Sequence, residues 1–500
     1  MNVLFFALSP VFAAELPPEA RAAEARPAPN PGDDGFTFLG LMSTRAVATS
    51  VRTNNALLNG QIVGQLGGTN DTTTGSPAAF GTEHRVGAFF RYAPPVLDGR
   101  AALDAAFEID FGFGDASYSV GGNAGGAYGA DQVNLQTRRL SGRYRIGDAT
   151  TAVVGLQFVA DGVNDPATSK LDDLVRSGGR LIFFGSEAAG ATVYGAVPTP
   201  MWDALRWKAG AYTLYEMGVG DPDDITLWMG DTQIAPAYAL RVGAHGWYLR
   251  DRAGGAGGFL GTGPTSALSE LQGGPRLDYR LFEGDAAPRV DADLLWLAVD
   301  VGWNTRLDAG RVGATGLLVA NFGELSIEGQ PSVGTQGYLA DAELRARIGP
   351  GDGSIVHVEG VWASSDGTGA DYYTGMLTGN AYGAVGAVYA SHGTYLLFPD
   401  PGAINRQVSV VYDVSNGGRG VAAVSAGLAW DVVPSRVNVA VGAAHARTGD
   451  FSPLGTELNA RVSAEPWLLG NVALTGATVL GTDLPVAPWT AFLSLDWLVL

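Results

Sequence analysis

The sequence predicts an all-β protein, namely a transmembrane antiparallel up-and-down β-barrel of roughly 16–18 strands. The first observation is that apolar residues alternate with small or polar ones, with a period of two, along most of the chain. The second is that segments such as Ala101 to Phe113 reach the roughly 9–11 residues that a tilted membrane strand needs, whereas soluble strands have about five or six. The third is that tight connections alternate with long ones, as in a membrane barrel with short turns at one rim.

The amino-acid composition excludes several classes of function. Cysteine is absent, which excludes a disulfide scaffold, a thiolate zinc site, an iron–sulfur cluster and a cysteine nucleophile. The formal net charge of −19 would repel nucleic acid, so we expect no nucleic-acid partner. The 72 glycines follow no collagen period, and the hydrophobic fraction of 46% is too high for a disordered chain.

The amino-terminal residues predict two segments that precede the barrel. Val3 to Ala14 is an apolar run that ends in small residues before Glu15, which is typical of a signal peptide, here over residues 1–14 and without a basic leader. Residues 15–35 are rich in proline and alanine and predict a flexible segment. No later run reaches the 18 or so consecutive apolar residues of a membrane helix. Residues 36–500 remain for the barrel, and about 26–29 residues per strand with its connection give roughly 16–18 strands.

Alternation assigns the individual strands. It is clearest in Ala101 to Phe113, Tyr338 to Ile348, Ser354 to Trp362, Leu458 to Glu465 and Trp489 to Leu500. Less regular alternation predicts strands over 86–92, 132–146, 152–160, 205–216, 238–248, 276–281, 295–306, 311–322, 424–433 and 436–443. Short turns are expected at 147–148, 308–310 and 433–435, and long loops at 114–131, 161–179, 251–274 and 364–379.

Charged residues collect in blocks on the polar faces of these strands. If Ala101 to Phe113 pairs with the next strand, its acidic row lies beside an arginine row, and such cross-strand pairs stabilise a sheet modestly. In a wide membrane barrel the polar faces point into the lumen, so we predict that these residues line it and govern selectivity. The alternative is that they only stiffen the wall. The residues are Arg139, Arg143, Arg145, Arg206, Lys208, Arg276, Arg280, Arg345 and Arg347 together with Asp104, Glu108, Asp110, Asp341 and Glu343.

Aromatic residues recur near the predicted strand ends. Rings with one polar edge suit the two membrane interfaces, so they predict aromatic girdles, although the core of a soluble sheet would also hold such residues. They include Phe36, Phe38, Phe89, Phe90, Tyr92, Trp202, Trp207, Trp247, Tyr248, Trp296, Trp303, Trp467, Trp489 and Trp497.

The last predicted strand, Trp489 to Leu500, resembles the closing strand of bacterial outer-membrane barrels. Leu493, Leu495 and Trp497 share one face, and the sequence ends within the strand. It departs from that family's pattern because it ends on Leu500 rather than on an aromatic residue. The resemblance implies a location in the bacterial outer membrane, contact with outer-membrane lipid and lipopolysaccharide, and recognition of this strand by the barrel-assembly machinery.

The architecture as a whole resembles porins and, more faintly, the wide barrels that export alginate and related exopolysaccharides. The second likeness rests on length and on arginine-studded segments such as Arg143 to Gly147. Barrels of this size leave an aqueous channel. The resemblance implies passive diffusion of small polar or ionic solutes through a charged lumen, with alginate-type export as the alternative. Porins are commonly trimers, which leaves a homo-oligomer open. An inward-folded loop would narrow the lumen, and Asp161 to Gly179, with a helical turn at Leu171 to Ser177, is the first candidate.

An enzyme in the barrel wall is a competing class that we do not expect. Barrel enzymes need a nucleophile or activated water beside a positioned histidine. His357 and Glu359 share a strand face, but such spacing arises often by chance. The other histidines are His84, His245, His392 and His445. A structural wall protein with a filled lumen is the third class left open.

No metal or other cofactor is expected. The residues Asp221, Asp223, Asp224 and Asp231 could hold Ca²⁺ in a loop, but an ordinary solvated acidic loop explains them better. The glycine-rich stretches 121–126 and 254–258 lack the Lys-Ser/Thr pair of a phosphate loop, so they predict flexible loop tips.

Overall fold

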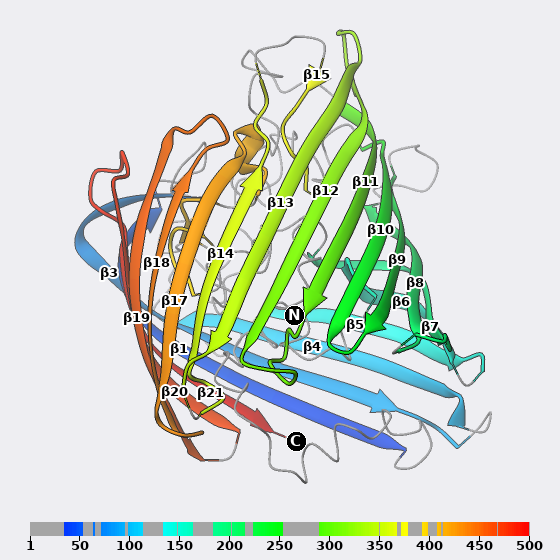
Figure 1. The fold of residues 1–500 in the computed structure, drawn as a ribbon, viewed down its shortest axis with the longest axis horizontal. Coiled ribbons are helices and arrows are strands. Elements are labelled where there is room, and N and C mark those ends of the chain that lie inside the picture. Colours follow the sequence, from blue (N-terminus) through cyan, green and yellow to red (C-terminus); the bar gives the residue numbers. More distant parts are fainter. Residues whose placement is uncertain are drawn as a thin grey trace.

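A large antiparallel β-sheet, closed on itself, dominates the protein (Figure 1). The computed structural model describes residues 35–53, 64–65, 72–95, 99–113, 134–147, 149–163, 184–201, 203–215, 224–253, 290–349, 351–367, 372–378, 393–398, 408–411, 414–467 and 469–499. Besides the large sheet they form a two-stranded parallel sheet and one 3-10 helix, η5 (Asn416–Gly418). In this described part of the chain, no helix is long and apolar enough to cross a membrane.

The wall of the barrel consists of 18 strands. The sheet holds 19, but the two-residue strand β15 (Tyr372–Tyr373) only flanks β13 in parallel, so it stands outside the ring. The first and last wall strands pair antiparallel from Gly40↔Val499 to Thr49↔Thr490 and close the barrel. The wall strands are β1 (Phe36–Thr53), β3 (Thr72–Tyr92), β4 (Ala101–Phe113), β5 (Asn134–Arg145), β6 (Thr150–Ala160), β7 (Phe184–Val197), β8 (Leu205–Tyr215), β9 (Ile225–Ala237), β10 (Leu240–Asp251), β11 (Val290–Trp303), β12 (Val312–Ile327), β13 (Val333–Arg347), β14 (Ile355–Ala363), β17 (Val421–Val433), β18 (Val437–Arg447), β19 (Pro453–Trp467), β20 (Gly470–Leu480) and β21 (Trp489–Val499).

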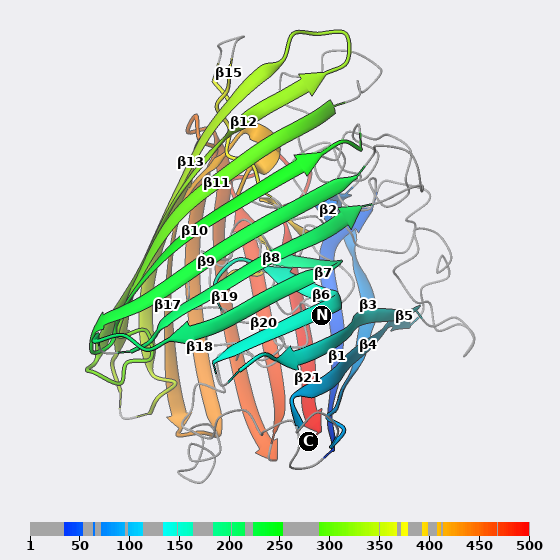
Figure 2. The same ribbon diagram turned by 90° about the vertical axis from the view of Figure 1, so that its right-hand side faces the viewer.

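The connections at the two rims differ in length, as predicted. At the short-turn rim they range from two residues (238–239) to eight (93–100), and the three predicted turns lie here, after β5, β11 and β17. The opposite, long-loop rim carries long connections such as 161–183, 252–289 and 364–420, although two of its connections, 328–332 and 448–452, have only five residues. The start of β1 and the end of β21 lie together at the short-turn rim. The β12–β13 hairpin extends beyond its neighbours at the long-loop rim (Figures 1 and 2).

The predicted strands agree with the observed ones wherever alternation is regular. Ala101 to Phe113 coincides with β4, and Trp489 to Leu500 matches β21 to within one residue. Four wall strands, β1, β7, β9 and β20, were not predicted. The predicted strand 276–281 lies outside the described residues, and no wall strand separates β10 from β11, which pair directly.

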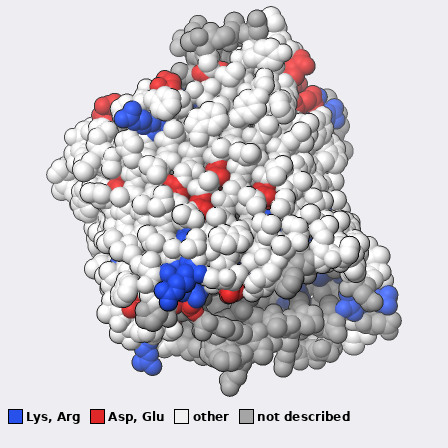
Figure 3. All heavy atoms as spheres, viewed as in Figure 1, with Lys and Arg blue, Asp and Glu red and all other residues white. Residues whose placement is uncertain are grey.

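The outer wall is apolar. On β12, Leu318 is 65% exposed, whereas its neighbours Leu317 and Val319 point inward and are buried. The face drawn in Figure 3 is mostly uncharged; its larger groups of blue spheres lie toward its upper and lower parts, and a few red spheres show in its middle. An apolar belt of this extent requires lipid around it. The barrel therefore crosses a membrane.

Outward aromatic side chains form two girdles, as predicted. Near the short-turn rim they are Phe36, Tyr92, Tyr144, Trp303, Trp430, Trp467 and Trp497, and near the long-loop rim Trp228, Tyr248, Phe322, Tyr338 and Trp362. Such belts mark the two membrane interfaces. The girdle assignment was wrong for Trp247 and Trp296, whose rings point inward and are fully buried, and for Phe89, which packs against the buried apolar cluster. Trp202 lies outside the described residues.

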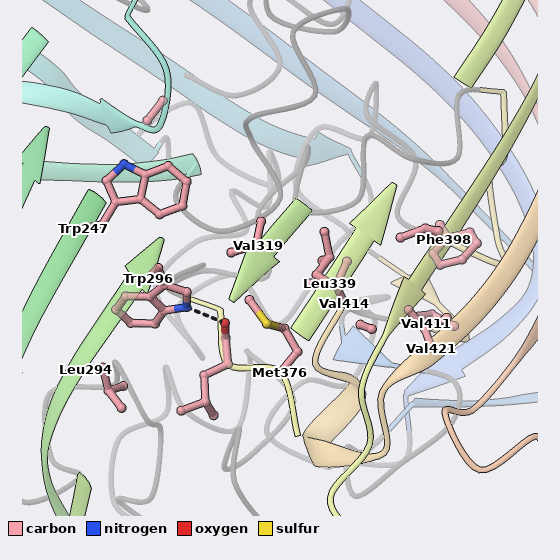
Figure 4. Close-up of a cluster of buried hydrophobic side chains, with 14 of the residues drawn as sticks. Trp247, Leu294, Trp296, Val319, Leu339, Met376, Phe398, Val411, Val414 and Val421 are labelled. Carbon is pink, nitrogen blue, oxygen red and sulfur yellow. Dashed lines mark hydrogen bonds between the residues drawn. The ribbon is translucent and has the colours of Figure 1, made fainter. Parts of the chain in front are cut away.

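Part of the long β14–β17 connection lies inside the barrel, and its described residues 372–378, 393–398 and 408–411 are called the inner segment here. Met376 and Phe398 are fully buried and belong to one apolar cluster with Val319 and Leu339 of the wall (Figure 4). Residues 364–379 were predicted as an ordinary long loop at the rim. The described part of that loop instead packs against the inner wall. The other predicted inward loop, 161–179, lies almost wholly outside the described residues.

Candidate functional site

The charged side chains of the inner wall concentrate toward the short-turn rim. Asp104 and Lys208 lie four residues into strands that begin at this rim, and Arg345 lies near the end of a strand that finishes there. The apolar contacts of the inner segment lie toward the opposite rim, where Ala363 ends β14 and Val421 begins β17, both fully buried. Most ion pairs of the described inner wall therefore lie toward the short-turn rim, and they form the candidate functional site.

Glu108 on β4 is the centre of a first ion-pair cluster. Its carboxylate is fully buried, and Oε1 lies 3.1 Å from Arg85 Nη2 and 2.6 Å from Arg138 Nη2. Arg138 also donates from Nε at 3.1 Å. It reaches the inner face together with its neighbour Arg139 because the β4–β5 register shifts between Ala106 and Phe107, and such a bulge re-aims a side chain. Strict alternation sends Arg138 outward, so the sequence analysis missed it.

Asp104 is the centre of a second cluster on the same strand. Its Oδ1 accepts a bond of 2.7 Å from Arg91 Nε, and its Oδ2 accepts one of 3.0 Å from Arg143 Nε. Arg139 Nη2 lies 3.9 Å from the same carboxylate, and Arg143 also donates to the Tyr194 hydroxyl on β7. The acidic row of β4 and the arginine row of β5 therefore meet, as the sequence analysis expected.

Together these clusters set five guanidinium groups against two carboxylates. Glu83, buried on the same face of β3, adds a third carboxylate. Arginine does not lose its proton in proteins, so cations outnumber carboxylates on this stretch of inner wall although the chain carries −19. Arg145 continues the inner face of β5 and is half-buried. Asp110 lies on β4 opposite Arg85 in the backbone register. The predicted residues Arg276 and Arg280 lie outside the described residues.

A third polar cluster connects β8, β9, β10 and β11. Lys208 Nζ lies 3.3 Å from Asp231 Oδ2 and donates to a backbone carbonyl of β6 at 2.7 Å. The His245 ring lies between two carboxylates, with Nδ1 2.8 Å from Asp231 and Nε2 2.6 Å from Asp300. Glycine at position 243 makes this possible, because a Cβ there would overlap the Asp300 carboxylate. Of these residues, the sequence analysis had singled out only Lys208 for the lumen; the half-buried Arg206 precedes it by two positions.

The predicted charges on β13 face inward as well. Arg345 Nε donates to Glu343 Oε1, and Arg347 Nη2 lies 3.0 Å from Asp352 in the following turn. Asp341 shares their face of the strand. These contacts are local, within β13 or its turn. The structure therefore does not bring the β13 charges into the β3–β5 clusters.

The described histidines do not form a common site. His84 and His445 contact the hydroxyls of Thr44 and Thr456 at 3.0 and 2.9 Å. Among the residues that the structure describes, no group of three or more His, Cys, Asp or Glu side chains is arranged to hold a metal ion. The alternative of a Ca²⁺ loop was wrong for Asp231, which lies within β9 and bonds to His245.

Comparison with known proteins agrees with this architecture. No model of a protein family matches the sequence. No curated protein matches it either. Among solved structures, OccK2 (OpdF) of Pseudomonas aeruginosa in complex with glucuronate superposes with a TM-score of 0.50 at 10% identity, covering 94% of this chain and 98% of that one. A BenF-like porin from Pseudomonas fluorescens Pf-5 gives 0.49 at 8% identity over 94% of this chain and 99% of its own. At these identities the likeness is one of fold, and the chain has the fold of a bacterial outer-membrane porin.

Proposed function

We propose that the chain is a passive outer-membrane channel for small polar or ionic solutes, and that it prefers anions. The observation that carries the proposal is the excess of guanidinium groups on the inner faces of β3 and β5. A positive wall in a narrow, water-filled passage raises the local concentration of anions and repels cations. The overall charge of −19 alone would lead to the opposite expectation.

The solute path is proposed to follow the side of the barrel that the inner segment leaves free. That segment packs against β11, β12 and β13 and extends as far as β19 and β21. The path would run along β3, β4 and β5. It would border the place where Arg45 lies 4.4 Å from the centre of the Phe492 ring, which the Tyr395 ring of the segment also contacts. Arginine suits such a path, because its planar group can bind a carboxylate or phosphate and release it again.

The predicted selectivity residues then divide into two roles. Arg139 and Arg143 belong to the clusters that face this path, and Arg145 continues their row. Lys208 and Arg345 make contacts with wall residues close by, and we assign them to holding the wall together. A narrowed interior also disfavours the export of a polymer such as alginate.

The test is the conductance of the purified protein in a planar lipid bilayer, with the reversal potential measured across a tenfold gradient of potassium chloride. The expected result is steady unit steps of current and a reversal potential whose sign shows preference for chloride. Preference for potassium would contradict the proposed role of the arginines. A folded barrel without current would contradict the channel itself.

A further inference from the structure

The inner segment is fastened to the wall at two distant places. At one, Trp296 Nε1 on β11 donates to the Leu377 carbonyl at 2.9 Å (Figure 4). At the other, residues 395–397 lie against β19, and the Tyr395 ring meets Phe492 of β21 at 5.8 Å between centres. In the ring of strands, β11 and β19 are separated by β12, β13, β14, β17 and β18. The inner segment therefore bridges a broad arc of the wall from within.

One carboxylate makes most of the hydrogen bonds that fasten the segment to β19. Glu457 is fully buried on the inner face, and its two oxygens accept bonds from three successive backbone N–H groups. The distances are 2.8 Å from Tyr395, 2.9 Å from Leu396 and 2.6 Å from Leu397. Three consecutive N–H groups that converge on one side chain cannot all lie in a regular strand, whose N–H groups alternate in direction. Glu457 therefore shapes this turn of the inner segment as well as anchoring it.

A neighbouring side chain reinforces the anchor. Asn459, the next inward residue on β19, donates to Glu457 Oε1 at 2.9 Å and to the Gly393 carbonyl of the inner segment. The apolar side chains that follow, Leu397 and Phe398, are fully buried, so the polar bonds are shielded from water. Hydrogen bonds from N–H groups to a carboxylate are among the stronger ones, and shielding increases their contribution.

We propose that Glu457 is the positioning residue that holds the inner segment across the lumen, and that the segment so held sets the cross-section left for solutes. The second half of the proposal rests on the proposed channel function. The first half does not, because it concerns only where the segment lies. The Glu457 carboxylate accepts the N–H groups of residues 395–397, while the Leu396 and Leu397 carbonyls accept bonds from the N–H groups of Val410 and Val411 within the segment.

Thiol labelling tests the position of the segment independently of any current. The chain has no cysteine, so Leu397→Cys introduces a single thiol at a fully buried site beside the anchor. With Glu457 present, a membrane-impermeant maleimide should label this thiol slowly. Adding Glu457→Ala should raise the labelling rate by about tenfold or more, because three backbone N–H groups lose their acceptor and the segment opens locally. The matched control is Glu465→Ala, which removes a carboxylate farther along the same strand and should leave the rate unchanged.

Bilayer recordings of the same variants test the effect on the lumen. Glu457→Ala should show a larger and noisier unit conductance than the parent, whereas Glu465→Ala should match it. A heat-dependent shift in gel mobility shows whether the barrel is folded in each case. If Glu457→Ala does not fold, Glu457→Gln replaces it, because the amide retains one acceptor oxygen but loses the charge. Unchanged labelling in a folded variant overturns the anchor. Faster labelling with unchanged conductance overturns the claim about the cross-section. Absence of current in the parent as well refutes the channel function and leaves the labelling result to decide the anchor.

Discussion

Replacing Glu108 by glutamine tests whether the ion-pair clusters hold the wall together. The change keeps the volume of the side chain but removes the charge that lies 3.1 Å from Arg85 and 2.6 Å from Arg138. At an effective dielectric constant of about 20, a unit pair about 4 Å apart attracts by about 4 kcal/mol, part of which offsets desolvation. Because both guanidinium groups would remain largely buried without their counter-ion, Glu108→Gln should lower the free energy of unfolding by about 3–5 kcal/mol.

The assay is urea unfolding of the barrel in lipid vesicles, followed by tryptophan fluorescence. The control is Asp293→Asn, which removes an ion pair of similar length, 2.6 Å to Arg252, whose side chains are 43% and 25% exposed. Removing this exposed ion pair should lower the free energy of unfolding by less than about 1 kcal/mol. The double variant E108Q/R138Q should recover part of the free energy of unfolding that Glu108→Gln loses, because it also removes one of the two arginines that Glu108 pairs with. A loss in Glu108→Gln no larger than in Asp293→Asn would refute the view that the Glu108 carboxylate is shielded from water.

Four further predictions follow from the same geometry. Arg143→Gln should move the reversal potential in a salt gradient toward that of an unselective pore, since it removes one of the five cations in the Glu108 and Asp104 clusters. Trp296→Phe removes the bond to the Leu377 carbonyl and should lower the free energy of unfolding in urea by about 1 kcal/mol. His245→Gln removes the ring that contacts both Asp231 and Asp300 and should lower the temperature of the heat-dependent gel shift. Leu318→Arg places a charge in the middle of the outer wall and should reduce the free energy of folding into vesicles by about 2–4 kcal/mol, measured by urea titration.

The wall could be predicted from sequence wherever its two faces differ chemically. β4 sets Phe107 and Ile109 outward and Glu108 inward, so its limits were predicted without error. β7 and β20 consist largely of glycine, alanine and threonine on both faces, which leaves no alternation to detect. β9 reverses the rule, because Leu227 and Met229 point inward to the apolar cluster while Gly230 faces lipid. Alternation thus reveals a barrel strand only where the lumen beside it is polar.

The sequence predicts which strands of the charged site lie side by side, but it does not predict which side chains contact one another. Neighbouring strands share a ladder, so the rows of β4 and β5 had to meet. The parity of β3 also places Arg85 and Arg91 inward, a signal that was present in the sequence and was not used. Arg138 points inward because of a bulge in β5. His245 can lie between Asp231 and Asp300 because residue 243, two positions away, is a glycine. Both are consequences of local backbone geometry that residue periodicity does not encode.

The inner segment shows where periodicity fails altogether. Its residues Tyr395 to Phe398 are four consecutive large apolar side chains within a connection, a pattern that fits neither a lipid-facing strand nor a solvated loop. Such a run must be buried, and in a barrel whose outer wall is already complete the only apolar surface available to it lies inside. That much can be argued from sequence. Its anchor cannot, because Glu457 lies some sixty residues away on a strand where alternation marks it only as inward and polar. A carboxylate on the inner face of a wide barrel should therefore be examined for backbone N–H partners from inward-folded connections before it is assigned to the solute path.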